Sequence, residues 1–380
     1  MPSKDDFEKT NDFVNNFVNA SKKKSEEMGT FNTLITGKTG VGKSTLINAI
    51  FKDNLAETGV GAPVTDSIKM ITKDDVPIKI YDTVGLELNQ EKQKQVIDDI
   101  NHIIAETGKK DKHEHIHCIW YCVSGNSSRL EDEEEKYINQ LADSGIPIIV
   151  VITKSYSNES KELKEYIKGR KNLSLKIKGI CRIVAKNYSE SNLSARVFGL
   201  KDLVDITRLI ISDDVVDAFA AAQIVDITFK RKKANIAISS AVALAAVQCV
   251  NPIPMSDAPI LIGIQTSMMA SIALVYGVKI SKDDIMKMLP IMLSTQGVKF
   301  AGVTIAGFLR SVVGVGTFMG GVISVVVGTS LTAALGKTYA LIMEEILLNK
   351  LDLKDLDNRK WKETINRIIK KVQKDEVVFE

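Results

Sequence analysis

Hydrophobic and polar positions follow one pattern in the first half of the chain and another in the second. Between Thr30 and about Ile211, short runs rich in β-branched and aromatic residues alternate with charged segments of helical spacing. The runs are FNTLIT, SIKMIT, VPIKIYD, HIHCIWYCV, IPIIVVIT and ICRIVA. Alternating strands and helices are typical of βαβ units, which build a largely parallel sheet. We therefore predict an α/β domain over residues 28–211, with helices flanking a mostly parallel sheet.

Beyond residue 212 this alternation ends and long apolar stretches begin. Ala234 to Ser256, Ala258 to Val278 and Ser311 to Gly336 contain no charged residue. Each is near or above the ~20 residues that span a bilayer. We predict an apolar all-α domain over residues 212–348, possessing either membrane contact or a soluble core of closely packed helices. Apolar length alone does not separate a buried helix from a spanning one, so both interpretations stay open.

Polar positions within these stretches bear on that choice. Gln248, Asn251 and Gln265 interrupt the apolar runs, which favours a helical bundle. In the membrane interpretation, the basic run Lys230 to Lys233 would face anionic headgroups. The first two stretches would then form a hairpin that turns at residues 251–254. The sequence therefore predicts a bundle with peripheral or conditional membrane association, and insertion remains the alternative.

Amphipathic helices are expected at both ends of the chain. Residues 1–27 and 349–380 are strongly charged and carry apolar side chains at helical intervals. These side chains are Phe7, Phe13, Val14, Phe17 and Val18 in the first segment, and Trp361, Ile365, Ile368, Ile369 and Val372 in the second. Each helix requires a surface on which to pack.

Composition and charge limit the classes of partner. The chain has 380 residues, of which 44% are hydrophobic, so more than one packed unit is expected. Lys and Arg number 50 and Asp and Glu 47, a near balance that disfavours a dedicated nucleic-acid binder. The N-terminus lacks the pattern of a secretory signal, so we expect a cytoplasmic protein. Its four cysteines lie in apolar contexts and should be buried, reduced thiols.

One motif predicts a phosphate-binding loop. Between an apolar strand and a helical pattern, the chain carries a complete G-x-x-x-x-G-K-S. Its glycines let backbone N–H groups face phosphate oxygens at the start of the helix. The Lys43 ammonium should bind the β- and γ-phosphates and assist catalysis, and the Ser44 hydroxyl should bind Mg²⁺. The residues expected to hold the nucleotide here are Gly37, Lys38, Thr39, Gly40, Val41, Gly42, Lys43, Ser44 and Thr45.

Two further segments follow in an order that suits nucleotide hydrolysis. A strand ends at Asp82, whose carboxylate should hold Mg²⁺ through water, and Gly85 should place an amide near the γ-phosphate. Between the loop and this strand, Thr65 is the candidate that closes over Mg²⁺ when triphosphate is bound. We therefore predict metal ligation by Ser44, Thr65 and Asp82, and catalytic roles for Lys43, Thr65 and Gly85.

These segments together resemble a known family. GKTGVGKSTLIN, GVGAPVT and DTVG are similar to the Era- and septin-type branch of the translation-factor class of P-loop GTPases, which includes immunity-related GTPases. The resemblance covers about half of the chain. It implies binding of GTP and GDP with Mg²⁺, and a cycle in which the loops around Thr65 and Gly85 order with GTP and relax after hydrolysis.

Recognition of the base departs from the family pattern. Thr153 and Lys154 match the segment that contacts guanine, and Ala185 with Lys186 resembles the segment that touches the base carbonyl. Tyr156, however, stands where the family carries the guanine-reading Asp. The lost carboxylate weakens the expectation of guanine preference.

Hydrolysis also departs from the usual pattern. Leu86 directly follows Gly85, where Ras-like enzymes carry a Gln that orients water. Gly40 occupies the position of the Asn found in potassium-dependent relatives, so a potassium route is not supported. Relatives with a hydrophobic residue at this position commonly pair across their nucleotides, and the resemblance implies the same arrangement here. We therefore expect slow hydrolysis unless a homodimer or another partner activates the site.

The second half also resembles a helical domain. The turn around Pro252 and Pro254, with Tyr276-Gly277, is similar to an uncharacterised Ala- and Gly-rich domain behind bacterial Era-like G domains. We expect a GTPase switch that controls this apolar domain at a membrane or a protein partner. An Era-like assembly factor for ribosomes or other RNA, and a nucleotide-binding module with little turnover, are the alternatives.

Overall fold

The computed structural model describes residues 4–51, 55–58, 60–74, 76–83, 85, 90–190, 193–248, 257–293, 299–300, 303–304, 325–356 and 358–374. Two compact units are present, one formed by Met28–Asp226 and the other by Met1–Glu27 with Ile227–Glu380. We call them the G unit and the helical unit.

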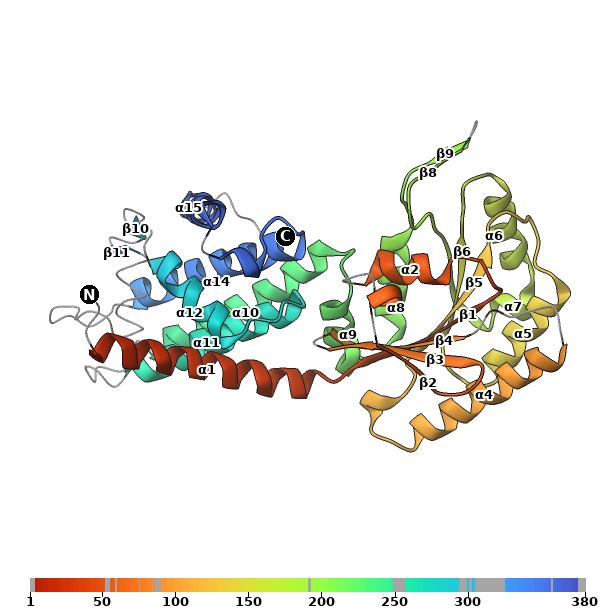
Figure 1. Ribbon diagram of the computed structural model, residues 1–380, viewed down its shortest axis with the longest axis horizontal. Helices are drawn as coiled ribbons and strands as arrows, with labels where there is room; N and C mark the ends of the chain where they lie inside the picture. Colours follow the sequence, from red (N-terminus) through yellow and green to blue (C-terminus); the bar gives the residue numbers. More distant parts are fainter. Residues whose placement is uncertain are drawn as a thin grey trace. The chain divides into compact units, whose positions relative to one another are not determined.

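A sheet of seven strands forms the centre of the described G unit, in the order β2-β3-β4-β1-β5-β6-β7 (Figure 1). The strands are β1 (Phe31–Gly37), β2 (Val60–Pro63), β3 (Ile68–Lys73), β4 (Val76–Thr83), β5 (Cys118–Ser124), β6 (Ile148–Thr153) and β7 (Ile177–Arg182). β4, β1, β5, β6 and β7 run parallel, whereas β2 and β3 are antiparallel to their neighbours. The predicted mostly parallel α/β sheet is confirmed.

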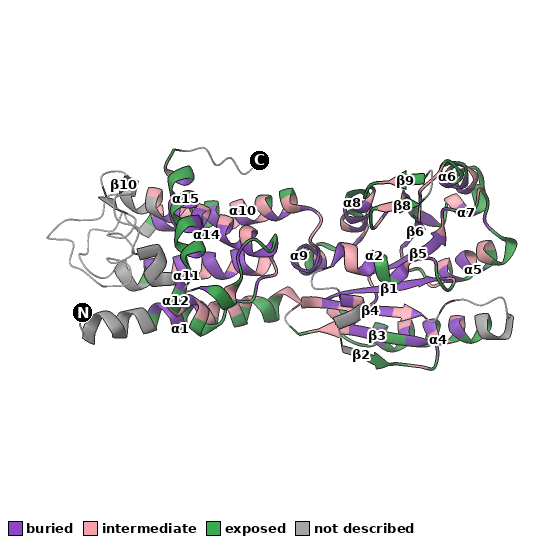
Figure 2. Ribbon diagram, turned by 45° about the horizontal axis from the view of Figure 1, so that its top comes forward, coloured by how far each residue is buried: buried purple, intermediate pink, exposed green. Residues whose placement is uncertain are grey.

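Helices cover both faces of this sheet (Figure 1). Trp120 and Val151 pack in one core with α2, α8 and α9, and Tyr121 and Val150 pack in the other with α4 to α7. Successive side chains of a strand point to opposite faces of the sheet, and both faces are covered. This explains why β5 and β6 are buried along nearly their whole length (Figure 2). The helices are α2 (Lys43–Ile50), α3 (Leu55–Thr58), α4 (Gln90–Gly108), α5 (Asp132–Ala142), α6 (Glu159–Gly169), α7 (Lys171–Ser174), α8 (Leu200–Ile210) and α9 (Asp213–Ala222), with the 3-10 turn η1 (Lys112–Glu114).

Buried cysteines contribute to the same cores. Cys118, Cys122 and Cys181 are free thiols, and burial raises the pKa of each to about 12. They therefore stay protonated at neutral pH and behave as small apolar side chains. Cys249 lies outside the described residues.

The G unit extends further along the chain than the predicted boundary at residue 211. Helix α9 follows that boundary, yet Val215, Ala218 and Phe219 are buried in the core beneath β1 and β4. Phe219 also packs against Phe31 of β1, with ring centroids 4.7 Å apart. The loss of β-type alternation after residue 212 therefore marks a last helix of the G unit as well as the helices beyond it.

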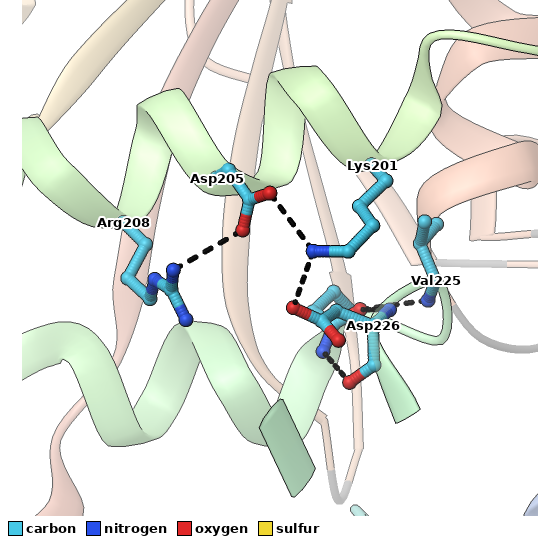
Figure 3. Close-up of polar contacts among 6 residues, drawn as sticks. Lys201, Asp205, Arg208, Val225 and Asp226 are labelled. Atoms are coloured by element: carbon cyan, nitrogen blue, oxygen red, sulfur yellow. Dashed lines mark hydrogen bonds and ion pairs between the residues drawn. The ribbon is translucent and has the colours of Figure 1, made fainter. Parts of the chain in front are cut away.

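A polar network fixes the end of the G unit (Figure 3). The Lys201 ammonium of α8 lies 2.8 Å from the Asp205 carboxylate and 3.2 Å from the Asp226 carboxylate. The Gln223 side-chain carbonyl accepts hydrogen bonds from the backbone N–H groups of Val225 and Asp226. The segment that leads into the next helix is thus held directly by α8.

The helical unit contains α1 (Lys4–Met28), α10 (Ile227–Gln248), α11 (Asp257–Val275), α12 (Lys282–Leu293), α14 (Val325–Leu347) and α15 (Arg359–Gln373), with the 3-10 turn η2 (Leu353–Asp355). Short strands β10 (Lys299–Phe300) and β11 (Val303–Thr304) form a separate pair. Helix α10 packs on α11 and α14, and α14 packs on α15. The apolar positions Phe13, Val14 and Phe17 of α1 and Trp361 and Ile365 of α15 are buried.

No helix within the described residues has the length and apolar character required to cross a membrane. The turn at residues 251–254 and most of the third apolar stretch lie outside the described residues.

The basic run at the start of α10 is oriented differently from the membrane interpretation. Lys230 is fully buried, and its ammonium donates to the Val275 carbonyl. Arg231 forms a bidentate ion pair with Glu344. Two of the four cations therefore stabilise the helix packing, and Lys232 is the one that is exposed.

Candidate functional site

The phosphate-binding loop lies between the end of β1 and the start of α2. Gly40 and Gly42 have φ angles of 76° and 103°, which residues other than glycine rarely adopt. A Cβ atom at Gly37 would overlap the Cys122 carbonyl of β5. Ser44 and Thr45 are exposed on the first turn of α2, where their hydroxyls are open to a ligand. The glycines therefore permit the compact loop that the motif predicts.

The Lys43 side chain folds back over this loop. It is only 9% exposed, and its ammonium donates to the carbonyls of Gly37 at 2.9 Å and Lys38 at 3.3 Å. These neutral acceptors hold the charge at the centre of the loop. An ammonium held in this place can bind a phosphate group that enters the loop.

A partly buried carboxylate, that of Asp82, lies at the end of β4, near this ammonium. Burial raises the pKa of Asp82, and the charges of Lys43 and Lys69 offset part of that rise. Its Oδ1 atom is buried and finds no hydrogen-bond partner among the described residues. Buried polar atoms in proteins are nearly always satisfied, so this oxygen is suited to hold a hydrated cation. Asp82 and Ser44 therefore fit the Mg²⁺ site that the sequence predicts.

Gly85 comes against the tip of the phosphate loop. A Cβ atom there would overlap the Thr39 backbone and hydroxyl. Only glycine permits this approach, which brings the Gly85 backbone beside the loop. Val84 and Leu86 lie outside the described residues.

Thr65 is held elsewhere. Its hydroxyl accepts a hydrogen bond from the Ser67 N–H at 3.2 Å, and its own N–H donates to the Ile68 carbonyl. Partial burial tends to raise the pKa of Asp99 on α4, but the nearby Ser67 and Thr65 side chains lower it overall. The structure thus engages Thr65 with Ser67 and Ile68 and places it near Asp99 of α4.

Lys38 is engaged by α5. Its ammonium lies 2.6 Å from Glu131 and 3.7 Å from Glu134. These two glutamates also form the capping box of α5, in which each side chain meets the other's backbone N–H. In this conformation, the Lys38 charge is directed to α5.

The loops after β6 and β7 meet the phosphate loop. The buried Thr153 hydroxyl lies within hydrogen-bond distance of the carbonyls of Val41 and Val123. A Cβ atom at Gly42 would lie 4.0 Å from Cε of Lys154, so the Lys154 stem follows the loop. Ala185 packs on the core and Lys186 is exposed. Thr153 and Lys154 are therefore brought to the phosphate loop, and Ala185 with Lys186 follows the adjacent strand.

An aromatic pair at this edge was not predicted from the sequence. Tyr156 and Tyr188 stack with ring centroids 4.0 Å apart and an interplanar angle of 9°. Tyr188 begins a hairpin of β8 (Tyr188–Glu190) and β9 (Leu193–Ala195) that projects from the G unit in Figure 1. A cavity of about 730 Å³ lies beside Tyr156, against the hairpin. The available signal was that both tyrosines follow adjacent parallel strands.

The segment that contains the phosphate loop is similar to known proteins. Residues 32–154 match the family described as 50S ribosome-binding GTPase. Neuronal-specific septin-3 of Danio rerio is 27% identical over 208 residues, which are 47% of this chain and 55% of that protein. Septin-9 of Rattus norvegicus is 23% identical over 206 residues, 47% of this chain and 36% of that protein. The chain thus spans between about a third and just over half of the length of these relatives.

Among solved structures, a probable GTP-binding protein EngB is similar to part of this chain. It is 21% identical, with a TM-score of 0.34, and the match covers 47% of this chain and 97% of that one. Cdc11 from Saccharomyces cerevisiae is 21% identical, with a TM-score of 0.29 and coverage of 48% and 95%. The family match to residues 32–154 coincides with the strands and loops that form the phosphate site. The chain therefore carries a P-loop G domain of the Era- and septin-like kind.

Proposed function

We propose that the chain hydrolyses GTP with Mg²⁺ as a switch that controls its helical unit. The observation that carries this proposal is the buried, unpartnered Oδ1 of Asp82 near the Lys43 ammonium. An acidic oxygen beside a phosphate-binding loop suits a magnesium–triphosphate complex. Bound Mg²⁺ would neutralise charge on the β- and γ-phosphates.

Each residue of the candidate site has a distinct role in this proposal. Lys43 binds the phosphates once it exchanges its carbonyl acceptors for phosphate oxygens. Ser44, Asp82 and Thr65 would hold Mg²⁺, and the Gly85 N–H would meet the γ-phosphate. Thr65 must leave Ser67 and Asp99 to do so. That displacement is the movement by which nucleotide binding changes the surface of the G unit.

Slow hydrolysis is expected from the residue that follows Gly85. Leu86 has no group that can orient water, so the rate must depend on a group from a second molecule or another partner. We propose a homodimer that pairs across the nucleotide face. Its activity per molecule would rise with protein concentration.

The link between the units supports control of the helical unit. Lys201 on α8 pairs with Asp226, and α10 begins at the next residue. Helix α8 packs on β7 and α2, whose ends carry the nucleotide loops. A shift of α8 would therefore be passed along the chain into α10.

We propose an anionic membrane surface as the target, with a protein partner as the alternative. Helix α10 exposes Ile236, Leu244 and Val247, which are 57%, 56% and 68% accessible, and Lys232 is exposed on the same helix. Apolar and basic side chains on one helix suit the interface of anionic lipid.

Flotation of the full-length protein with anionic liposomes tests this target. We expect flotation with a GTP analogue and little with GDP or without nucleotide. Leu244→Glu should reduce flotation severalfold, because it places a charge in the apolar surface. Leu209→Glu is the matched control, since Leu209 is 78% exposed on the G unit. Absence of flotation in every nucleotide state would reject the membrane target and leave a protein partner.

The description of the matching family names ribosome binding, which keeps RNA assembly as a second candidate. Against it, positive and negative charges are nearly balanced. Salt-sensitive retention of RNA by the purified protein would favour this role.

A further inference from the structure

We propose that this site selects purine nucleotides by shape, with little preference for guanine over adenine, and that the stacked Tyr156–Tyr188 pair determines this selectivity. The inference rests on the proposed nucleotide site and specifies the bases that it accepts. Tyr156 would contact the base, and Tyr188 would position Tyr156.

The pair lies where a base would meet the protein. Thr153 joins the loop after β6 to the phosphate loop through Val41, and the Lys154 stem follows Gly42. Tyr156 comes two residues later, and its N–H donates to the Lys154 carbonyl at 2.7 Å. A nucleotide with its phosphates in the loop would therefore direct its base toward this segment.

Tyr188 fixes the orientation of the Tyr156 ring. The two rings are nearly parallel, and the Tyr188 hydroxyl donates to the Glu190 carboxylate at 2.6 Å. Stacked aromatic pairs are stabilised beyond the burial of their area. The pair thus joins the loop after β6 to the hairpin after β7 and provides an aromatic wall.

Carboxylates near this wall are already engaged. The cavity beside Tyr156 has one carboxylate in its wall, Glu159, among its described residues. Glu159 is fully exposed, and the Ser157 side chain together with its own backbone N–H lowers the pKa of its carboxyl. Glu190 accepts from Tyr188. Neither offers guanine the free pair of acceptors that its N1–H and exocyclic amine require.

The magnitude of base selection follows from this arrangement. A site built to hydrogen-bond a group rejects an analogue without that group by ~10⁴-fold or more, whereas a site that acts by shape discriminates by ~10²-fold or less. Guanine and adenine have the same bicyclic outline, so we expect affinities for GTP and ATP within about tenfold of each other. A pyrimidine covers less of an aromatic wall and should bind at least about tenfold more weakly.

Displacement of a fluorescent nucleotide analogue from the full-length protein, with Mg²⁺ present, measures these ratios for GTP, ATP and UTP. Tyr156→Asp should raise the GTP-to-ATP ratio at least about tenfold, because it supplies the paired acceptor. Tyr188→Ala should lower the purine-to-UTP ratio severalfold, whereas Tyr188→Phe, which keeps the stack, should preserve it. Thermal melting of each variant shows whether it is folded. The wild-type ratios of GTP, ATP and UTP affinity test the proposal even if a variant does not fold.

Three results would overturn the inference. The first is a wild-type preference for GTP over ATP above about a hundredfold, and its loss in Glu159→Gln would then assign guanine reading to Glu159. The second is an unchanged purine-to-UTP ratio in folded Tyr188→Ala. The third, failure of wild type to bind any nucleotide, would overturn the proposed function itself, so the two failures are distinguishable.

Discussion

Replacing Lys43 by Ala is expected to weaken GTP binding about a hundredfold. The ammonium is the buried cation at the centre of the phosphate loop, where it now contacts Gly37 and Lys38. Hydrogen bonds to charged groups contribute ~1.5–3 kcal/mol, which corresponds to between about ten- and two-hundredfold in affinity. Isothermal titration with a GTP analogue and Mg²⁺ measures the change.

Lys168→Ala is the matched control for this prediction. Lys168 is an exposed lysine of α6 that pairs with Glu165, outside the phosphate loop. It should bind the analogue as wild type does. Unchanged affinity in a folded Lys43→Ala protein would contradict the assignment of the loop.

Replacing Asp82 by Asn is expected to have two opposite effects. Magnesium-dependent hydrolysis should fall at least tenfold, because the amide does not supply the anionic oxygen that Mg²⁺ prefers. The nucleotide-free protein should instead become more stable by about 1 kcal/mol, since a partly desolvated carboxylate with one buried, unpartnered oxygen is removed. Turnover assays and urea unfolding at pH 7 measure the two effects.

The stability gain should depend on pH. Burial raises the pKa of Asp82, so the folded protein binds its proton more tightly than the unfolded chain does. Protonation of Asp82 therefore stabilises the fold below the unfolded pKa, and this contribution is lost as pH rises through the folded pKa. The advantage of Asp82→Asn should shrink on acidification. A variant that is less stable at pH 7 and hydrolyses GTP normally would refute both roles.

Local sequence patterns predicted the sheet and the phosphate loop because both depend on short-range constraints. A strand buried on two faces must be apolar along its length, as Ile148 to Ile152 shows. The loop needs glycines at fixed spacing before Lys43, since its backbone adopts positive φ angles at Gly40 and Gly42. Such requirements are visible in sequence without knowledge of the rest of the fold.

Contacts between distant segments were not predictable in this way. Helix α9 joins the G unit because Phe219 finds Phe31, a pairing that no local pattern encodes. Lys230 looked like a headgroup-binding cation, but its partner is a carbonyl 45 residues further along the chain. The stacking of Tyr188 on Tyr156 depends on the folded position of the hairpin after β7, which no local pattern predicts. The sequence predicts Thr65 as a metal ligand because it lies between the phosphate loop and β4. In the structure, Thr65 lies near Ser67 and near Asp99 of α4.

Steady-state release of phosphate from GTP by the full-length protein tests the central claim most directly. It should be measured with Mg²⁺ and with chelator, over a wide range of protein concentration. We predict turnover that requires Mg²⁺ and whose rate per molecule rises with concentration, because Leu86 leaves the site dependent on a second molecule. Stable binding of GTP without turnover at any concentration would contradict a GTPase switch and identify a nucleotide-binding module instead.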